Sequence, residues 1–264
     1  MTHYYASKLV KGTIRRKSML YKTYVEYGDY AMTHVKGCNH GCLYCYSAID
    51  KIDKGHIKSY QAWREPYLVE NTLELLSKEL PKLKNEIQSV TLSFNTDPFM
   101  YLYPEIATMS MNAIALINSY GIKCRVLTKG VLPYQLSNLS KDNEYGITLI
   151  SLDPDFCSRM EPGAAPITSR IHALRALHDA HCRTFVSIEP FMTPNIHQTN
   201  LLALMESISF VDKIIFGKLN HIDDIYDYPY YREFYNEKVR EVISFCQARG
   251  IEYHIKEKTF TPYL

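Results

Sequence analysis

The chain has 264 residues, of which 46% are hydrophobic and 22% are charged, a balance typical of an ordinary globular protein. Its 30 Lys and Arg side chains oppose 28 Asp and Glu, and the net charge of +2 is too small to argue for nucleic acid as a partner. No apolar run reaches the length of a transmembrane helix, and the opening "MTHYYASKLVKG" lacks the apolar core of a signal peptide, so we expect a cytoplasmic protein with no membrane partner.

Short β-rich runs alternate with amphipathic helical stretches along the chain. Gly121 and Gly250 fall where two helices should end, Pro166 favours a first helical turn, and Pro81 should end or kink its helix. In chain order the pattern predicts a strand at 29–35, a helix at 69–83, a strand at 89–94, a helix at 107–121, a strand at 122–128, a short helix at 133–140, a strand at 146–152, a helix at 166–180, a strand at 183–189, a helix at 199–209, a strand at 212–217, a helix at 231–250 and a strand at 251–257.

This alternation predicts an α/β protein built from βαβ units around a parallel sheet. The number of units fits a partial or complete (β/α) barrel, and no Gly/Ser-rich linker divides the chain, which favours a single domain. Active sites of such barrels form at the carboxyl ends of the strands. Polar residues follow the predicted strands at these points and are expected to converge on one rim: Asn95, Thr96, Asp97, Lys129, Ser151, Asp153, Glu189, Lys218 and Asn220.

Three of the seven cysteines stand together in "KGCNHGCLYCYS", with the spacing C-x3-C-x2-C. Cys38, Cys42 and Cys45 could share one face of a helix, but Gly37 and Gly41 favour a loop whose backbone can wrap around a bound group. Thiols stay reduced in the cytosol, so clustered cysteines there indicate metal binding or catalysis rather than disulfides.

Two kinds of metal group are compatible with this loop. A structural zinc site needs four ligands, and His40 is the nearby candidate for the fourth. Three thiolates suit a cubane 4Fe–4S cluster better, because the iron without a protein ligand stays open to a small molecule. The other cysteines show no ligand spacing and are expected to be small buried residues: Cys124, Cys157, Cys182 and Cys246.

The cysteine motif after a first strand, with Tyr44 just before the last cysteine, resembles the radical S-adenosylmethionine (SAM) superfamily. The resemblance implies a partial (β/α)6 TIM-like barrel at 29–217, preceded by an N-terminal arm at 1–28 and followed by a C-terminal helix and strand extension at 218–264. It also implies one 4Fe–4S cluster per chain, held by Cys38, Cys42 and Cys45, and an electron donor such as flavodoxin or ferredoxin. SAM would bind the open iron, and its reductive cleavage would give a 5′-deoxyadenosyl radical that abstracts hydrogen from substrate.

The same resemblance implies contacts to SAM. Thr96 and Asp97 in "NTDPF" are expected at its amino group, Lys129 in "LTKG" at its carboxylate, Ser151 at the ribose and Tyr44 near the adenine. Arg170 either binds the cofactor or forms a structural ion pair with Glu161. Substrate-side candidates follow later strands: Glu189, Lys218, Asn220 and His221.

Within the superfamily, "GCNHGCLYCY", "TDPF", "LTKG" and "EPGAAPITSRIHAL" most resemble the spore photoproduct lyase-related group, which repairs a thymine lesion in DNA. One residue departs from that pattern, because Phe94 stands where the lyase has its hydrogen-donating cysteine. The sequence therefore predicts a radical SAM enzyme of unidentified substrate, with a lyase-like DNA repair enzyme and a zinc-binding interaction module as alternatives. A basic run that could touch nucleic acid is expected to be a solvated arm: Lys8, Lys11, Arg15, Arg16 and Lys17.

Overall fold

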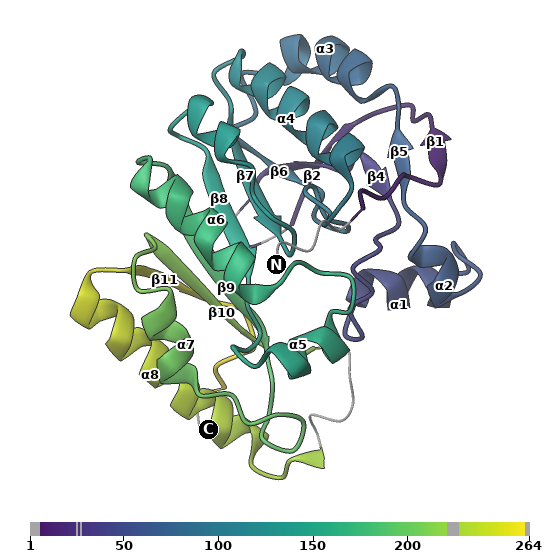
Figure 1. The fold of residues 1–264 in the computed structure, drawn as a ribbon. Coiled ribbons are helices and arrows are strands. Elements are labelled where there is room, and N and C mark those ends of the chain that lie inside the picture. Colours follow the sequence, from purple (N-terminus) through teal and green to yellow (C-terminus); the bar gives the residue numbers. More distant parts are fainter. Residues whose placement is uncertain (1–5, 25, 27, 221–226, 262–264) are drawn as a thin grey trace.

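An open sheet of eight strands forms the centre of the protein, whose computed structural model describes residues 6–24, 26, 28–220 and 227–261 (Figure 1). Neighbouring strands are parallel, except that the edge strand β2 is antiparallel to β3. From one edge to the other the order is β11 (Glu252–Ile255), β10 (Lys213–Lys218), β9 (Arg183–Phe191), β8 (Glu144–Thr148), β7 (Lys123–Thr128), β6 (Ser89–Leu92), β3 (Tyr30–Met32) and β2 (Leu20–Lys22).

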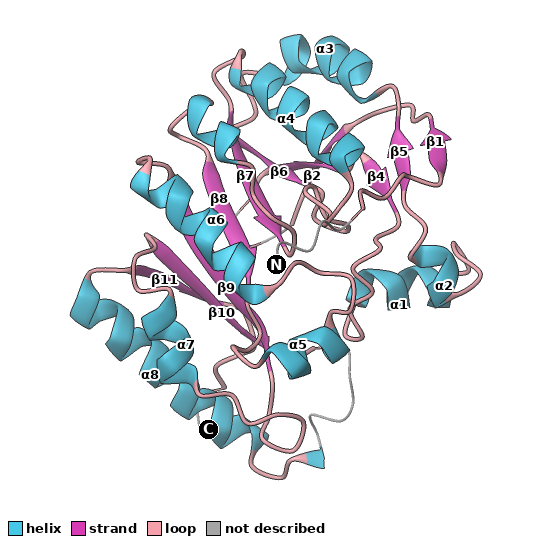
Figure 2. Cartoon of the chain, in the orientation of Figure 1, coloured by secondary structure: helices cyan, strands magenta, loops and turns pink. Residues whose placement is uncertain are grey.

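Helices connect the parallel strands and cover one side of the sheet (Figure 2). α4 packs on β7, α6 on β8 and β9, and α8 on β10 and β11. Each helix buries one apolar stripe against the strands, which is how an amphipathic helix stabilises a sheet. The helices on this side are α3 (Thr72–Leu83), α4 (Pro104–Asn118), α6 (Ile167–Asp179), α7 (Leu201–Ser207) and α8 (Tyr231–Arg249).

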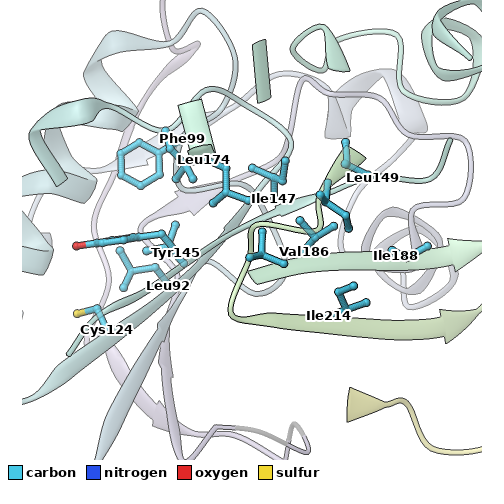
Figure 3. Packing of buried hydrophobic residues seen from close by; sticks show 14 of the residues in the cluster. Leu92, Phe99, Cys124, Tyr145, Ile147, Leu149, Leu174, Val186, Ile188 and Ile214 are labelled. Carbon is cyan, nitrogen blue, oxygen red and sulfur yellow. The ribbon is translucent and has the colours of Figure 1, made fainter. Parts of the chain in front are cut away.

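The core lies between this sheet and its helices. Side chains of Ile147, Val186, Ile188 and Ile214 come from neighbouring strands and pack together (Figure 3). Every residue of β6 and β8 is buried, as is typical of central strands in a parallel sheet. These central strands hold their carboxyl ends in fixed positions beneath the loops that follow them.

The predicted alternation and the partial barrel are confirmed. The described sheet has two edges, β2 and β11, and does not close, and α8 with β11 forms the expected C-terminal extension. Element ends differ by a few residues, and the largest consequence is at β8, which ends at Thr148 rather than at 152. α3 ends at Leu83, two residues after Pro81. None of the described helices is long and apolar enough to cross a membrane.

Several short elements were not predicted. β1 (Gly12–Ile14) pairs with β5 (Tyr67–Val69), which also pairs with β4 (Val35–Lys36), so that a second, three-stranded sheet lies beside the first. Because β1 and β2 both join sheets, much of the expected N-terminal arm is part of the folded body. The helices α1 (Tyr46–Asp53) and α2 (Tyr60–Trp63) follow the cysteine loop, and α5 (Pro154–Met160) follows β8.

Candidate active site

A cavity of about 460 Å³ opens at the carboxyl ends of the strands. The cysteine loop forms one end of its wall, and the ends of β9 and β10 with the segment after β11 form the other. The structure thus brings together most of the polar residues that follow strands in the sequence. Those that line the cavity are Asn95, Thr96, Asp97, Lys129, Glu189, Lys218 and Asn220.

Cys38, Cys42 and Cys45 all line this cavity and none forms a disulfide. Burial raises the pKa of Cys42 to about 12, so a thiolate there needs a cation beside it. Iron supplies that charge, and the donor set therefore fits an iron–sulfur cluster. A structural zinc site would need a fourth protein ligand beside these three thiolates.

His40, the expected fourth zinc ligand, is buried and has both ring nitrogens engaged. Its Nε2 accepts the backbone N–H of Tyr101 at 2.9 Å, and its Nδ1 lies 3.3 Å from the Asp97 carboxylate. Because a neutral imidazole has one donor and one acceptor nitrogen, these contacts use both. The placement of His40 gives the zinc-module alternative no support.

Asp97 fastens the loop after β6 to the end of β7. Its carboxylate accepts hydrogen bonds from the backbone N–H of Phe99, the hydroxyl of Thr128 and the backbone N–H of Lys129, besides the contact with His40. Burial alone would raise the pKa of Asp97, but His40, Thr128 and the Lys129 N–H hold it at about 2. These partners use the acceptor positions that the predicted contact to the SAM amino group would need.

The neighbouring Thr96 side chain has fewer hydrogen-bond partners than Asp97. It lines the cavity, and its hydroxyl makes one long contact, 3.4 Å, to the carbonyl of Val35. Of the predicted pair, Thr96 has the side chain with fewer partners in the described structure.

Tyr44, Glu161 and Arg170 form a buried cluster behind the cysteine loop. The Tyr44 hydroxyl donates to one oxygen of Glu161, and Arg170 lies 2.7 Å from the other. The remaining nitrogens of Arg170 donate to the carbonyls of Ala165 and Thr148. Glu161 and Arg170 thus form the structural ion pair rather than the cofactor rim, and Arg170 is absent from the residues that line the cavity.

The segment after α5 packs directly on the cysteine loop. Leu43 N–H donates to the carbonyl of Met160 at 2.9 Å, and Gly163 N–H donates to the carbonyl of His40 at 2.7 Å. The approach is so close that a Cβ on Gly163 would lie 2.2 Å from the carbonyl oxygen of Asn39. Glycine is required here because two backbones touch.

Lys129 lines the cavity near the buried cluster of Tyr44, Glu161 and Arg170. Its Nζ lies 5.5 Å from the centroid of the Tyr44 ring, within the range of a cation–π contact. Burial alone would lower the pKa of Lys129, but the nearby Cys42, Glu161 and Asp97 raise it to about 12. The site therefore keeps a positive charge next to the cysteines.

Ser151, predicted at the SAM ribose, is placed elsewhere. Because β8 ends early, Ser151 lies in the turn before α5, where its hydroxyl accepts the Asp153 N–H and lies 3.1 Å from His197. The hydroxyl residues that line the cavity include Thr148 and Ser187, which we did not predict. A signal was present, since each stands between two apolar residues, Thr148 between Ile147 and Leu149 and Ser187 between Val186 and Ile188.

At the other end of the cavity, Glu189 packs over Gly217, where a Cβ would lie 2.8 Å from the Glu189 carboxyl carbon. Burial raises the pKa of Glu189, against the influence of Lys256 and Lys129. Lys218 and Asn220 line the same end, and His221 lies outside the described residues.

Glu26 closes this end across the gap between the two sheet edges. Its carboxylate lies 2.6 Å from His254 Nε2 and 3.1 Å from Lys256 Nζ, and it accepts the Glu257 N–H at 3.3 Å. Glu26 comes from the β2–β3 connection, whereas its partners lie on or after β11. The sequence does not predict this contact, because Glu26 and His254 are 228 positions apart in the chain.

Comparisons with known proteins agree with this geometry. The model of the radical SAM superfamily matches residues 32–208. An uncharacterized protein, ORF301, of Acidianus two-tailed virus is 24% identical over 192 residues; the match covers 66% of this chain and 62% of that protein, less than two thirds of its length.

Solved structures share the fold at low identity. Spore photoproduct lyase complexed with dinucleoside spore photoproduct has a TM-score of 0.68 at 14% identity, covering 94% of this chain and 82% of the other. A mutant of that lyase with bound AdoMet gives 0.67 at 14% identity, with 96% and 82% covered. SuiB of Streptococcus suis, bound to S-adenosylmethionine, gives 0.54 at 14% identity, with 86% and 46% covered.

Proposed function

The chain belongs to the radical SAM superfamily, and we propose that it is an enzyme that binds one 4Fe–4S cluster and SAM at the cysteine end of the cavity and acts on a substrate held at the other end. The observation that carries the proposal is the presence of Cys38, Cys42 and Cys45 on the wall of one strand-end cavity. We further propose that the chain is a single radical SAM domain, cytoplasmic, and reduced by a carrier such as flavodoxin or ferredoxin.

Cys38, Cys42 and Cys45 would hold the cluster and leave one iron without a protein ligand. When bound, the cluster supplies the electron for reductive cleavage of SAM, which begins hydrogen abstraction from the substrate. Buried side chains beside the cysteine loop, among them Tyr44 and Glu161, would limit the access of water to the cluster.

Five residues around the cysteines would contact SAM. The hydroxyl of Thr96 accepts from the amino group, and the charge of Lys129 pairs with the carboxylate. Thr148 and Ser187 line the wall within the barrel and offer hydroxyls to the ribose, in place of Ser151. Tyr44 contributes an aromatic wall and lies beneath Lys129.

The far end of the cavity would hold the substrate. Glu189 is a half-buried hydrogen-bonding group there, and Lys218 and Asn220 supply donors. Both kinds of group on one wall suit a polar substrate, which would be held by direct hydrogen bonds and screened from water.

Metal analysis after anaerobic reconstitution tests the proposal. About four iron and four sulfide per chain are expected, with an EPR signal of the reduced cluster that changes when SAM is added. Cys42→Ala should lose the cluster, whereas Cys246→Ala, which alters a buried cysteine far from the cavity, should keep it. Zinc without iron and sulfide, or an unchanged cluster in Cys42→Ala, would contradict the proposal.

The lyase-like DNA repair alternative rests on a shared fold at 14% identity. Phe94 lines the cavity at the position where the lyase pattern has a cysteine, and two residues of the basic N-terminal run form ion pairs: Lys11 contacts Glu65, and Arg15 contacts Glu70 and Glu74. Weak binding of damaged DNA without a steep salt dependence would remove this alternative.

A further inference from the structure

The short helix α2 and the residue after it hold the cysteine loop from a second direction. The Tyr60 hydroxyl donates to the carbonyl of Cys42 at 2.6 Å, and the Cys38 N–H donates to the carbonyl of Trp63 at 2.8 Å. These bonds fix Arg64, the residue that follows α2, against the loop between its first two cysteines.

The Arg64 side chain lies directly on Gly41. A Cβ at position 41 would be 2.7 Å from Arg64 Nε and 2.9 Å from its Cζ, and Gly41 has a positive φ of 65°. The positive φ favours glycine at position 41, and the absence of a side chain there leaves room for the guanidinium of Arg64 on the loop backbone. Gly41 immediately precedes Cys42 in the sequence.

The charge of Arg64 is not balanced by an acidic group in the described structure. Two other arginines near the cavity have glutamate partners, since Arg125 pairs with Glu144 and Arg170 with Glu161. Arg64 has no ion pair with a described residue, and its buried Nε donates to no described acceptor. A second cation, Lys8, donates to Asn39 of the same loop at 2.8 Å, and burial together with the charge of Arg64 lowers the pKa of Lys8.

We infer that Arg64 raises the reduction potential of the cluster proposed above, by placing a partly buried and unpaired positive charge against the loop that binds it. The inference rests on the proposed function. Reduction adds one electron to the cluster, so a nearby positive charge stabilises the reduced form more than the oxidised form. The charge of Arg64 acts on the cluster across protein, and protein screens a charge less than water does.

A redox titration of the reconstituted protein, followed by EPR, tests this inference without an activity assay. Arg64→Gln and Arg64→Met remove the charge, and Arg64→Lys keeps it. We expect the two neutral variants to show about a tenfold lower ratio of reduced to oxidised cluster at a given potential, equivalent to about 59 mV for one electron. Arg64→Lys should stay near wild type, as should Lys36→Gln, which removes an exposed cation two residues before Cys38.

The outcomes separate the inference from the proposed function. If wild-type protein holds no cluster, the proposed function fails. If wild type titrates normally and the neutral variants share its midpoint potential, the inference alone is overturned. Loss of the cluster from all three Arg64 variants would also overturn it, in favour of a purely structural role. Loss from the neutral variants but not from Arg64→Lys would support the need for charge at this position.

Discussion

The two ends of the cavity are built differently. The cysteine end is held on both sides by backbone hydrogen bonds and by buried polar groups, such as the Glu161–Arg170 pair. The opposite end is lined by Glu189, Lys218 and Asn220, and is closed by ion pairs of Glu26 that water reaches. The first arrangement fixes a loop in one position, whereas the second leaves its polar side chains available to a ligand.

This difference matches the two tasks proposed for the cavity, which are radical generation at the cysteine end and substrate binding at the opposite end. A group that generates a radical must be held in one geometry, so the loop that binds it is fastened by many buried hydrogen bonds. A substrate end must admit and release its ligand, so its contacts are weaker and more exposed. We therefore expect a substitution at the cysteine end to lower the free energy of unfolding much more than an equivalent substitution at the opposite end.

The largest effect is expected from Glu161→Gln. It leaves Arg170 as an uncompensated buried charge, which should lower the free energy of unfolding by about 3–5 kcal/mol. Glu206→Gln is the matched control, because Glu206 pairs with Arg249 on the surface and should contribute less than about 1 kcal/mol. Urea unfolding of the apo-proteins gives both values, and equal values would contradict the difference between the two kinds of pair.

Two identical glycine substitutions compare the two ends directly. Gly163→Ala places a Cβ against the backbone of Asn39 and should cost about 2–3 kcal/mol and reduce cluster incorporation. Gly217→Ala meets the flexible side chain of Glu189, which can move, so the cost should stay below about 1 kcal/mol. Thermal unfolding and iron content measure both effects, and a greater cost at Gly217 would reverse the comparison.

Asp97 should make the cysteine end sensitive to acid. Its pKa in the folded protein, about 2, lies below the usual 3.8, so its stabilisation is present above about pH 4 and is lost as the pH falls towards 2. The lowered pKa of Asp97 corresponds to about 2 kcal/mol of stabilisation at neutral pH. The stability gap between wild type and Asp97→Asn, measured in urea, should therefore be full at pH 7 and narrow below pH 4; a gap independent of pH would show that the carboxylate charge is unimportant.

The smallest effect is expected at Glu26. Because its partners His254 and Lys256 are partly exposed, Glu26→Gln should lower stability by less than about 1 kcal/mol, and high salt should remove most of the difference. Cluster content should not change. Loss of the cluster in this variant would mean that the two ends are coupled and would weaken the comparison.

The sequence predicted the cysteine end better than the opposite end, for physical reasons. The three cysteines and the glycines between them form one short segment, and the alternation of strands and helices is a local pattern. The end of β8 could not be predicted, because apolar residues continue past Thr148. Ser151 was therefore expected at the end of the strand, whereas it lies in the turn before α5. Contacts such as Glu26 to His254 depend on how distant segments meet, and nothing local encodes them.

The central claim is that the cysteine end binds SAM and a cluster that cleaves it. The most direct test is to reduce the anaerobically reconstituted protein, add SAM and measure 5′-deoxyadenosine by mass spectrometry. Wild-type protein should form 5′-deoxyadenosine, and Cys42→Ala should form none above the background of the reductant alone. Absence of 5′-deoxyadenosine from cluster-loaded wild type, or equal formation by Cys42→Ala, would contradict the account.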